Sequence, residues 1–373
     1  GAYRVTDRWV VDAEASHGQL GPGGKLGTSY QATDRTNVYV NYGLEDERGL
    51  DGLYGRSSNL IAGARTRLSD SSSIYLENRY QSADSRSGLT HATGVNFAPT
   101  DRWSLGSTVD VGTLVDRETG AETERKAGGL RIGYGFEKVQ LSSGFEYRLD
   151  DTEQLDGSWA DRTTYLFRNN GKYQVTPDWR VVLKLNHAFS DSSLGELYDG
   201  GYTEGVLGWA YRTVAHDRLN VLAKYTYFYN LPTTDQFNLR EVTDQFMQRS
   251  HIASLDVMYD LTSSWSVGGK YAYRLGEVSL DREDPDYFDN DAHLYVLRSD
   301  SRFVADWEAS MELRLLDLPS LSDSRSGALI GVYRYVGDHM KVGVGYNFTD
   351  FSDDLTDLSY DHHGFFINFN IRM

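Results

Sequence analysis

The sequence predicts an all-β fold, in which an up-and-down antiparallel sheet closes into a barrel that spans a membrane. Three observations favour this fold: short polar corners recur along the chain, an alternating stretch follows each corner, and these stretches are long for soluble strands. A membrane strand needs about 9–11 residues with every second one apolar, so a barrel keeps a low average hydropathy. The mean hydropathy of −0.52 is therefore compatible with membrane insertion.

The corners are clearest in a motif that occurs twice, Thr-Asp-Arg-Trp at 6–9 and again at 100–103. Thr, Ser, Asp and Pro favour tight turns, because their side chains bond the nearby main chain or preset a backbone angle. Successive corners are separated by about 30 to 45 residues, enough for a strand, a longer loop and a returning strand. Related corners stand at 33–35, 69–71, 176–178, 216–218, 262–264 and 337–339.

The corners and loops, taken in order, predict about twenty strands, within a range of roughly 18–22. An even number returns both ends of the sheet to the side of the short turns. The corner near Asp306 is the least clearly marked. The expected strands are 9–16, 25–32, 36–44, 57–68, 72–82, 88–98, 102–113, 125–135, 138–149, 162–175, 179–190, 202–213, 218–230, 249–260, 265–277, 293–304, 308–317, 326–336, 340–348 and 362–371.

Each strand has an apolar face and a mixed, basic face, since successive side chains point to opposite sides of a sheet. In the strand from Trp179, Leu183 and Leu185 share one face, and Arg180 and Lys184 share the other. Tryptophans that directly follow corners suit an aromatic girdle at the membrane surface; they are Trp9, Trp103, Trp179 and Trp265. The residues expected to face lipid include Tyr225, Tyr227, Val181, Leu183, Val267 and Phe369.

A soluble β-sandwich or a β-propeller is the alternative architecture, because both also alternate and repeat. Soluble strands average about 5–6 residues, whereas the stretches here run to about 9–13. Short corners also alternate with long acidic loops such as 281–291, as in a membrane barrel with short turns on one rim and long loops on the other. No run approaches the roughly 18 apolar residues of a membrane helix, and the chain has 0 Cys, so disulfides and thiolate metal sites are excluded.

The last strand resembles the terminal signal of bacterial outer-membrane proteins, in which alternating apolar residues run to the end of the chain. In GFFINFNIRM the signal comprises Gly364, Phe365, Ile367, Phe369 and Ile371. The departure is Met373, where that family usually ends in an aromatic residue, so the signal could be the internal 364–369 stretch. The resemblance to Gram-negative outer-membrane β-barrels covers the whole chain as an architecture, and it identifies no solute.

This resemblance implies a place in the bacterial outer membrane, with the short turns on the periplasmic side and the long acidic loops on the extracellular side. It also implies membrane lipid, lipopolysaccharide and the barrel assembly machinery as partners. We expect one domain over 1–373, either alone or as the C-terminal barrel of a longer protein. Barrels of about 16–18 strands leave an aqueous channel, and 22-stranded transporters hold a plug. Alternation begins by Trp9, which leaves no room here for a preceding plug domain. No cofactor and no nucleic-acid partner are expected.

The less apolar face carries more basic than acidic residues, although the net charge is −17. Rings of Arg and Lys favour anions, because a wall of low dielectric constant focuses their field on a passing solute. Acidic residues expected on the same face include Asp12, Glu14, Glu77, Glu146, Glu204 and Glu312. The expected lumen-lining basic residues are Arg65, Arg67, Arg79, Arg131, Arg168, Lys172, Arg180, Lys184, Lys224, Lys270, Arg274, Arg314 and Lys341.

Metal and catalytic sites receive little support. Asp281, Glu283, Asp284 and Asp286 form a weak Ca²⁺ candidate, since the loop lacks the spacing of a calcium-binding motif. The 353–363 stretch, with Asp361-His362-His363, superficially resembles the Asp and His groups of outer-membrane proteases, but those barrels have about half this strand number. We therefore expect no enzyme.

Three functions remain open at this stage. The first is an outer-membrane channel that passes anionic solutes or acidic polymers through a net-basic lumen. The second is an export or anchoring barrel whose lumen holds a partner protein, a polysaccharide or an upstream passenger segment. The third is a structural or adhesive surface protein with a closed lumen. Conductance in planar bilayers separates the first function from the other two.

Overall fold

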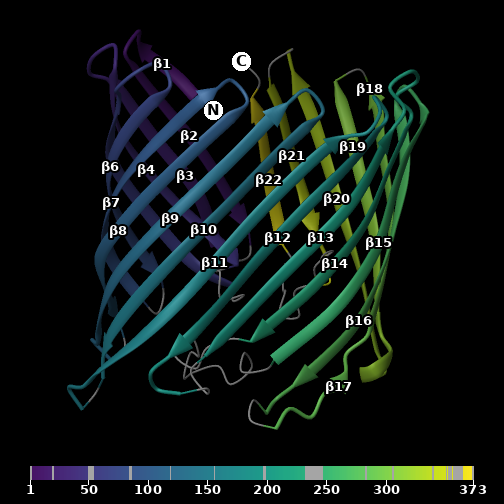
Figure 1. Ribbon diagram of the computed structural model, residues 1–373. Coiled ribbons are helices and arrows are strands. Elements are labelled where there is room, and N and C mark those ends of the chain that lie inside the picture. The colour runs from purple at the N-terminus through teal and green to yellow at the C-terminus, as the bar shows by residue number, and fades with distance from the viewer. Residues whose placement is uncertain are drawn as a thin grey trace.

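The structure is a computed structural model of the chain, and it consists almost wholly of antiparallel strands (Figure 1). Among the described residues, the 3-10 turn η4 (Pro319–Leu321) interrupts them, and none of the described helices is long and apolar enough to cross a membrane. The described residues are 2–18, 21–48, 54–83, 86–117, 119–154, 156–195, 199–231, 247–281, 284–304, 306–337, 340–349, 351, 355 and 364–371.

The strands follow one another along a single sheet, each pairing with the next. The one exception is β17, a two-residue strand beside β16, after which β16 pairs with β18. The strands are β1 (Ala2–Thr6), β2 (Trp9–Gly18), β3 (Gly21–Gln31), β4 (Thr36–Arg48), β5 (Tyr54–Arg67), β6 (Ser72–Ala83), β7 (Arg86–Thr100), β8 (Trp103–Asp116), β9 (Glu122–Phe136), β10 (Val139–Glu153), β11 (Trp159–Gln174), β12 (Trp179–Ser192), β13 (Gly200–Arg212), β14 (Leu219–Leu231), β15 (Met247–Thr262), β16 (Trp265–Ser279), β17 (Phe288–Asp289), β18 (Ala292–Val304), β19 (Trp307–Leu318), β20 (Asp323–Val336), β21 (Met340–Asn347) and β22 (Gly364–Ile371).

The up-and-down antiparallel prediction is confirmed, and the 22 strands lie within the expected range. The twenty expected strands all appear, including the pair that meets at the corner near Asp306. The two additional strands are the five-residue β1 and the two-residue β17. Both are too short to show an alternating pattern in the sequence.

The predicted corners lie together on one rim, at the top of Figure 1, near both chain ends. Two to six residues join the strands there. Side chains close several of these turns: the main-chain N–H of Trp179 donates to Thr176 Oγ1 at 3.2 Å, and that of Thr36 donates to Thr33 Oγ1 at 3.0 Å. The connections on the opposite rim include the three longest, 232–246, 280–291 and 348–363.

The sheet is not closed by a hydrogen-bonded ladder, which corrects the expectation of a barrel closed by strand pairing. Among the described residues, no ladder joins β22 to β1 or β2, although β2 and β22 approach each other. The physical reason lies in β1, which pairs with Trp9–Asp12 and so occupies the corner-side edge of β2. The sheet curls round so that its two edges meet at a seam.

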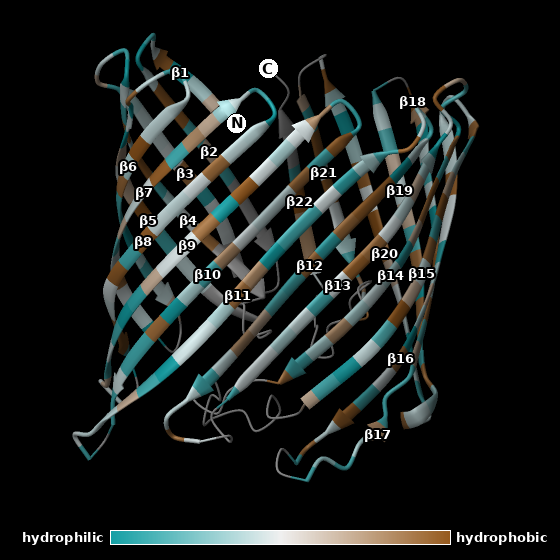
Figure 2. Cartoon of the chain, in the orientation of Figure 1, coloured by the Kyte–Doolittle hydropathy of each residue, from teal (hydrophilic) through white to brown (hydrophobic). Residues whose placement is uncertain are grey.

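The two faces of the sheet differ as the alternation predicts, and Figure 2 shows hydropathy changing from residue to residue along the strands. Large apolar side chains are exposed on the outer, convex face, where Leu183 and Val109 are 50% and 60% exposed. Trp9, Trp103, Trp179 and Trp265 are also exposed, each directly after a corner. These exposed apolar side chains would be covered by lipid in a membrane.

The concave face, here called the inner wall, has an apolar patch toward the rim of the long loops. Ala272, Leu294 and Leu316 are buried there against Phe351 and Leu355, two residues of the connection between β21 and β22. Phe351 and Leu355 are only 4% and 5% exposed. Phe351 and Leu355 therefore pack inward against strands β15 to β19.

Candidate functional site

The candidate site is the inner wall, where the structure places the basic residues named from the sequence. They alternate along their strands with outward-facing apolar residues: Lys184, for example, lies between the exposed Leu183 and Leu185. The short side chains on the inner wall allow charged neighbours to meet across strands. A Cβ at Gly63 would collide with Glu77 and Tyr39, which shows that all three share this face.

Several of the predicted basic residues are already paired with carboxylates. Arg79 bonds Glu77 at 2.7 Å and Asp110 at 3.2 Å, while Lys184 lies 2.8 Å from Glu204. The Glu312 carboxylate accepts from both Arg298 and Arg314. Lys341 donates to Glu308 at 2.8 Å, and the Tyr335 hydroxyl donates to the same carboxylate at 2.7 Å. These pairs fix the wall but present little net charge to a solute.

Besides the acidic residues expected from the sequence, the inner wall carries three further carboxylates that pair with basic side chains. Asp110, Asp150 and Glu308 all accept from arginine or lysine there. Arg125 holds Asp150 through two bonds of 2.7 Å, and Arg148 bonds Glu146 at 2.6 Å. Alternation alone signals the face of each carboxylate, but pairing depends on which residues stand opposite across the ladder.

Arg274 differs from the role expected for it. It is 4% exposed, and its guanidinium donates to the Leu355 carbonyl at 3.0 Å, the Asn290 carbonyl at 3.1 Å and the Asn290 side-chain oxygen at 2.9 Å. The side chain thus links β16 to two long connections. It is a structural group in the apolar patch rather than a charge available to a solute.

Four other basic residues have neutral or partial partners. Arg67 donates to the Asp34 carbonyl at 3.3 Å, and Arg180 donates to Gln174 at 2.8 Å, both beside corners. The Arg65 guanidinium lies 5.6 Å from the centre of the Tyr75 ring. Lys270 stands opposite Asp256 in the β15–β16 ladder.

The remaining four form a distinct group, here called the basic wall: Arg131, Arg168, Lys172 and Lys224. They come from β9, β11 and β14, so they lie on one side of the molecule. None of the four makes an ion pair with any residue that the structure describes. Arg131, Arg168 and Lys172 are also exposed. Their charge is thus available on the concave face.

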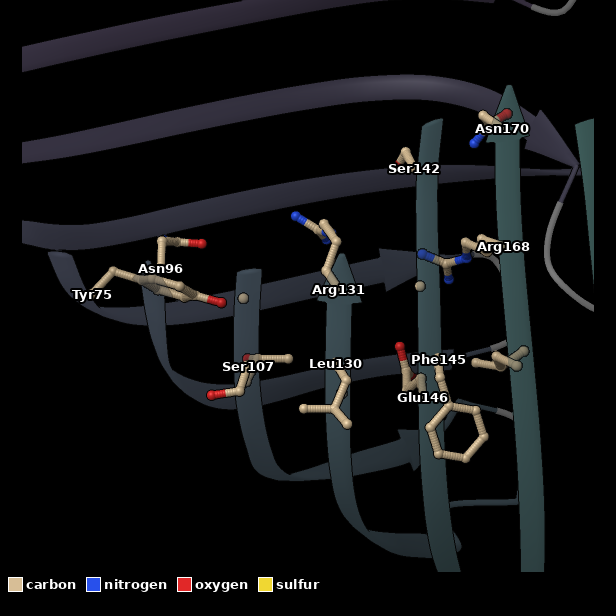
Figure 3. A pocket seen from close by; sticks show the side chains of 15 residues that line it. Tyr75, Asn96, Ser107, Leu130, Arg131, Ser142, Phe145, Glu146, Arg168 and Asn170 are labelled. Atoms are coloured by element: carbon tan, nitrogen blue, oxygen red, sulfur yellow. The ribbon is translucent and has the colours of Figure 1, made fainter. Parts of the chain in front are cut away.

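A hollow of about 220 Å³ lies at the upper part of this wall, between β6 and β11 (Figure 3). Its floor is main chain at Gly106, Gly129 and Gly144, and its charged lining residues are Arg131, Arg168 and Glu146. The neutral polar lining residues are Tyr75, Asn96, Ser107, Thr108, Ser142 and Asn170. The hollow exists because glycines stand where neighbouring strands carry long side chains.

The other predicted sites are placed less completely. Phe365 and Ile367 of the terminal signal are 79% and 61% exposed on the outer face. Gly364 begins β22, and Phe369 and Ile371 pair with Val342 and Met340 in the β21–β22 ladder; the Phe369 and Ile371 side chains lie outside the description. The proposed face of Phe369 therefore stays a prediction.

The calcium candidate is not assembled in the described part of the chain. The main-chain N–H of Asp284 donates to Asp281 at 3.3 Å, Asp286 is described nearby, and Glu283 lies outside the described residues. No group of three potential metal ligands occurs among the residues described. Asp361, His362 and His363 also lie outside them.

No known family model matches the sequence, and no curated protein is significantly similar to it. The fold, however, is shared with solved outer-membrane proteins. The copper transporter OprC aligns with 99% of this chain over 72% of its own, with a TM-score of 0.54 and 10% identity. The FrpB iron transporter of Neisseria meningitidis (F3-3 variant) aligns with 92% over 69% of its own chain, with a TM-score of 0.55 and 9% identity.

The solved structure of a receptor shares the fold to a similar extent. The alcaligin outer-membrane receptor FauA of Bordetella pertussis aligns with 92% of this chain over 69% of its own, with a TM-score of 0.51 and 13% identity. All three are transporters or receptors, and none is an enzyme. At such identities the likeness concerns the fold alone. The chain therefore has the fold of Gram-negative outer-membrane β-barrel receptors and transporters, which confirms the resemblance to outer-membrane barrels but not the expected closure of the sheet by strand pairing.

Proposed function

We propose that the chain is an outer-membrane channel that passes anionic solutes across the bacterial outer membrane. The single observation that supports this most strongly is the basic wall, because its four cations lack carboxylate partners among the described residues. In the membrane, the seam between β2 and β22 brings the two edges of the sheet together, so that the inner wall encloses a lumen. The partners are then outer-membrane lipid, lipopolysaccharide and the barrel assembly machinery.

The negative net charge of −17 does not oppose this function. Exposed loop charges lie in water and are screened beyond about 8–10 Å at physiological salt. Charges on a wall of low dielectric constant act on a solute at close range. We therefore propose that the four cations of the basic wall, rather than the loops, decide which ions pass.

Planar bilayers test the proposal. The purified protein should conduct, and its reversal potential in a KCl gradient should lie on the anion side. Changing the basic wall to Gln (R131Q, R168Q, K172Q and K224Q together) should move that potential toward neutrality. The matched control is K126Q, which removes a 59% exposed lysine beside Glu124 on β9, the strand that carries Arg131. A cation-side potential in the unchanged protein would refute anion passage.

A second candidate function is supported by two inward-packed residues of the connection between β21 and β22. Phe351 and Leu355 cover part of the inner wall, and this contact supports an interior that can hold a further segment of chain. A lumen filled by a partner protein, a polysaccharide or a passenger segment would give no steady current in the same bilayers. Silence in a correctly folded preparation would favour this second function.

A further inference from the structure

The basic wall contains a recess whose geometry is more specific than a general positive field. Gly144 of β10 stands opposite Arg131 of β9 on one side and opposite Arg168 of β11 on the other. Neighbouring strands lie about 4.8 Å apart, so the two arginine Cα atoms are about 10 Å apart across the glycine. The Cα atoms of two arginines therefore flank one position that has no side chain.

The space over Gly144 is open. A Cβ built there would meet only the main-chain oxygens of Arg168 and Leu130, at 3.8 and 3.9 Å. Figure 3 shows the Arg168 side chain extending from β11 over the neighbouring strand β10. Arg131 lies on the other side of that strand, with Asn96 and Gly106 beyond it. The recess is bounded by cations on two sides and by main chain beneath.

The electrostatics of this recess differ from the rest of the inner wall. Several arginines elsewhere on the inner wall are held by carboxylates, as Arg125 is by Asp150 through two bonds of 2.7 Å. Glu146 is the one carboxylate that lines the described hollow, and it already accepts from Arg148 at 2.6 Å. The recess thus keeps an excess of positive charge beside a carboxylate that has its own partner.

Neutral polar side chains also line the recess. Ser142 and Asn170 stand opposite each other in the β10–β11 ladder, two residues from Gly144 and from Arg168 on the same face. Arginine binds carboxylate and phosphate oxygens in paired hydrogen bonds, and amide and hydroxyl groups can bond further polar atoms of a solute. We propose that Arg131 and Arg168, on either side of Gly144, form a binding site for the oxyanion, carboxylate or phosphate, of a polar solute.

This proposal rests on the proposed function, because the site would bind anions inside the channel. Anion binding can nevertheless be measured without a current. The full chain in detergent is titrated calorimetrically with citrate, and separately with inorganic phosphate, at low salt. Binding of one probe or both shows which oxyanion the site takes. R131Q and R168Q should each weaken that binding at least tenfold, whereas K224Q, which removes a cation outside the recess, should change it less than twofold.

A second variant distinguishes binding in the recess from attraction by the general positive potential of the inner wall. G144V fills the recess with an apolar side chain and leaves every charge in place, so it should also weaken binding at least tenfold. The matched control is G135V on β9, where an added Cβ meets no atom within 4 Å and which does not line the recess. If G144V does not fold, the two arginine variants still decide the question.

The outcomes separate the two proposals. Absence of binding, unchanged binding in G144V, or equal loss in K224Q and R168Q would overturn the site, while an anion-side reversal potential would leave the channel function intact. Conversely, binding that depends on Gly144 and both arginines in a protein that carries no current would support the site and refute the channel.

Discussion

At the scale of single residues, the face on which a side chain lies decides what it can do. Leu183 on the outer face and Leu222 on the inner wall are 50% and 41% exposed, so exposure alone does not distinguish them. Only their positions in the alternating pattern of each strand distinguish them. Leu183 comes directly after the inward-facing Val182 and so faces outward, whereas Leu222 shares the inward face with Lys224 and Thr226.

This pair supplies a matched test of the faces. An arginine at a lipid-facing position costs about 2–4 kcal/mol near the middle of a bilayer, and a position facing water costs little. L183R should therefore impair folding into lipid vesicles, and L222R should fold almost as well as the unchanged protein. Folded yield can be followed by gel mobility without heating. Equal tolerance of both variants would mean that the assignment of faces is wrong.

Arg274 gives a second residue-scale prediction. Its removal leaves the Leu355 carbonyl and the Asn290 groups without their donor. An unsatisfied buried polar group costs about 1–3 kcal/mol. R274M should therefore lower the urea midpoint of unfolding in detergent, whereas R180Q, beside a corner, should leave it nearly unchanged. An unaltered midpoint in R274M would show that this arginine does not hold the connections in place.

At the scale of elements, the corners are stabilised locally. In the corner between β13 and β14, the Arg212 guanidinium hydrogen-bonds Asp217 and lowers the pKa of that carboxyl. A lowered pKa in the folded state means that the contribution is present above the ordinary pKa of Asp and is lost as the pH falls through the folded value. R212Q should raise the pKa of Asp217 toward that ordinary value in an NMR titration. A pKa that does not move would mean that Arg212 is not the cause.

The elements also show what the sequence could predict. Period-two alternation and turn-forming residues are local signals, so twenty strands and their corners were predictable. β1 was not, because its five residues precede the first corner and leave no pattern to read. The seam was also unpredictable, since it depends on which short strand occupies the edge of β2.

The candidate site was predictable only in part, for a related reason. Alternation placed Arg131, Arg168 and Lys184 on the same face, but their environments differ through cross-strand register. Lys184 has Glu204 within 2.8 Å, and Arg168 has Gly144 opposite it. The Arg274 contact with Leu355 joins residues 81 positions apart and leaves no local signal.

At the scale of the whole molecule, one sheet carries an apolar outer face and an inner wall on which most charges are neutralised. Arg65, Arg67 and Arg180 have neutral partners, whereas the four residues of the basic wall make no ion pair among the described residues, so selectivity should follow from these four rather than from the total charge. Their field should add in an enclosed lumen and be lost if the interior is filled. The proposed channel function therefore depends on the sign of the ion that passes.

The most direct test reverses that charge. Arg131, Arg168, Lys172 and Lys224 are changed together to Glu, and the reversal potential is measured in planar bilayers under a KCl gradient. We expect an anion-side potential for the unchanged protein and a cation-side potential for the variant, at similar conductance. A conducting variant that keeps the original reversal potential would contradict the role of the basic wall, because selectivity would then come from other groups.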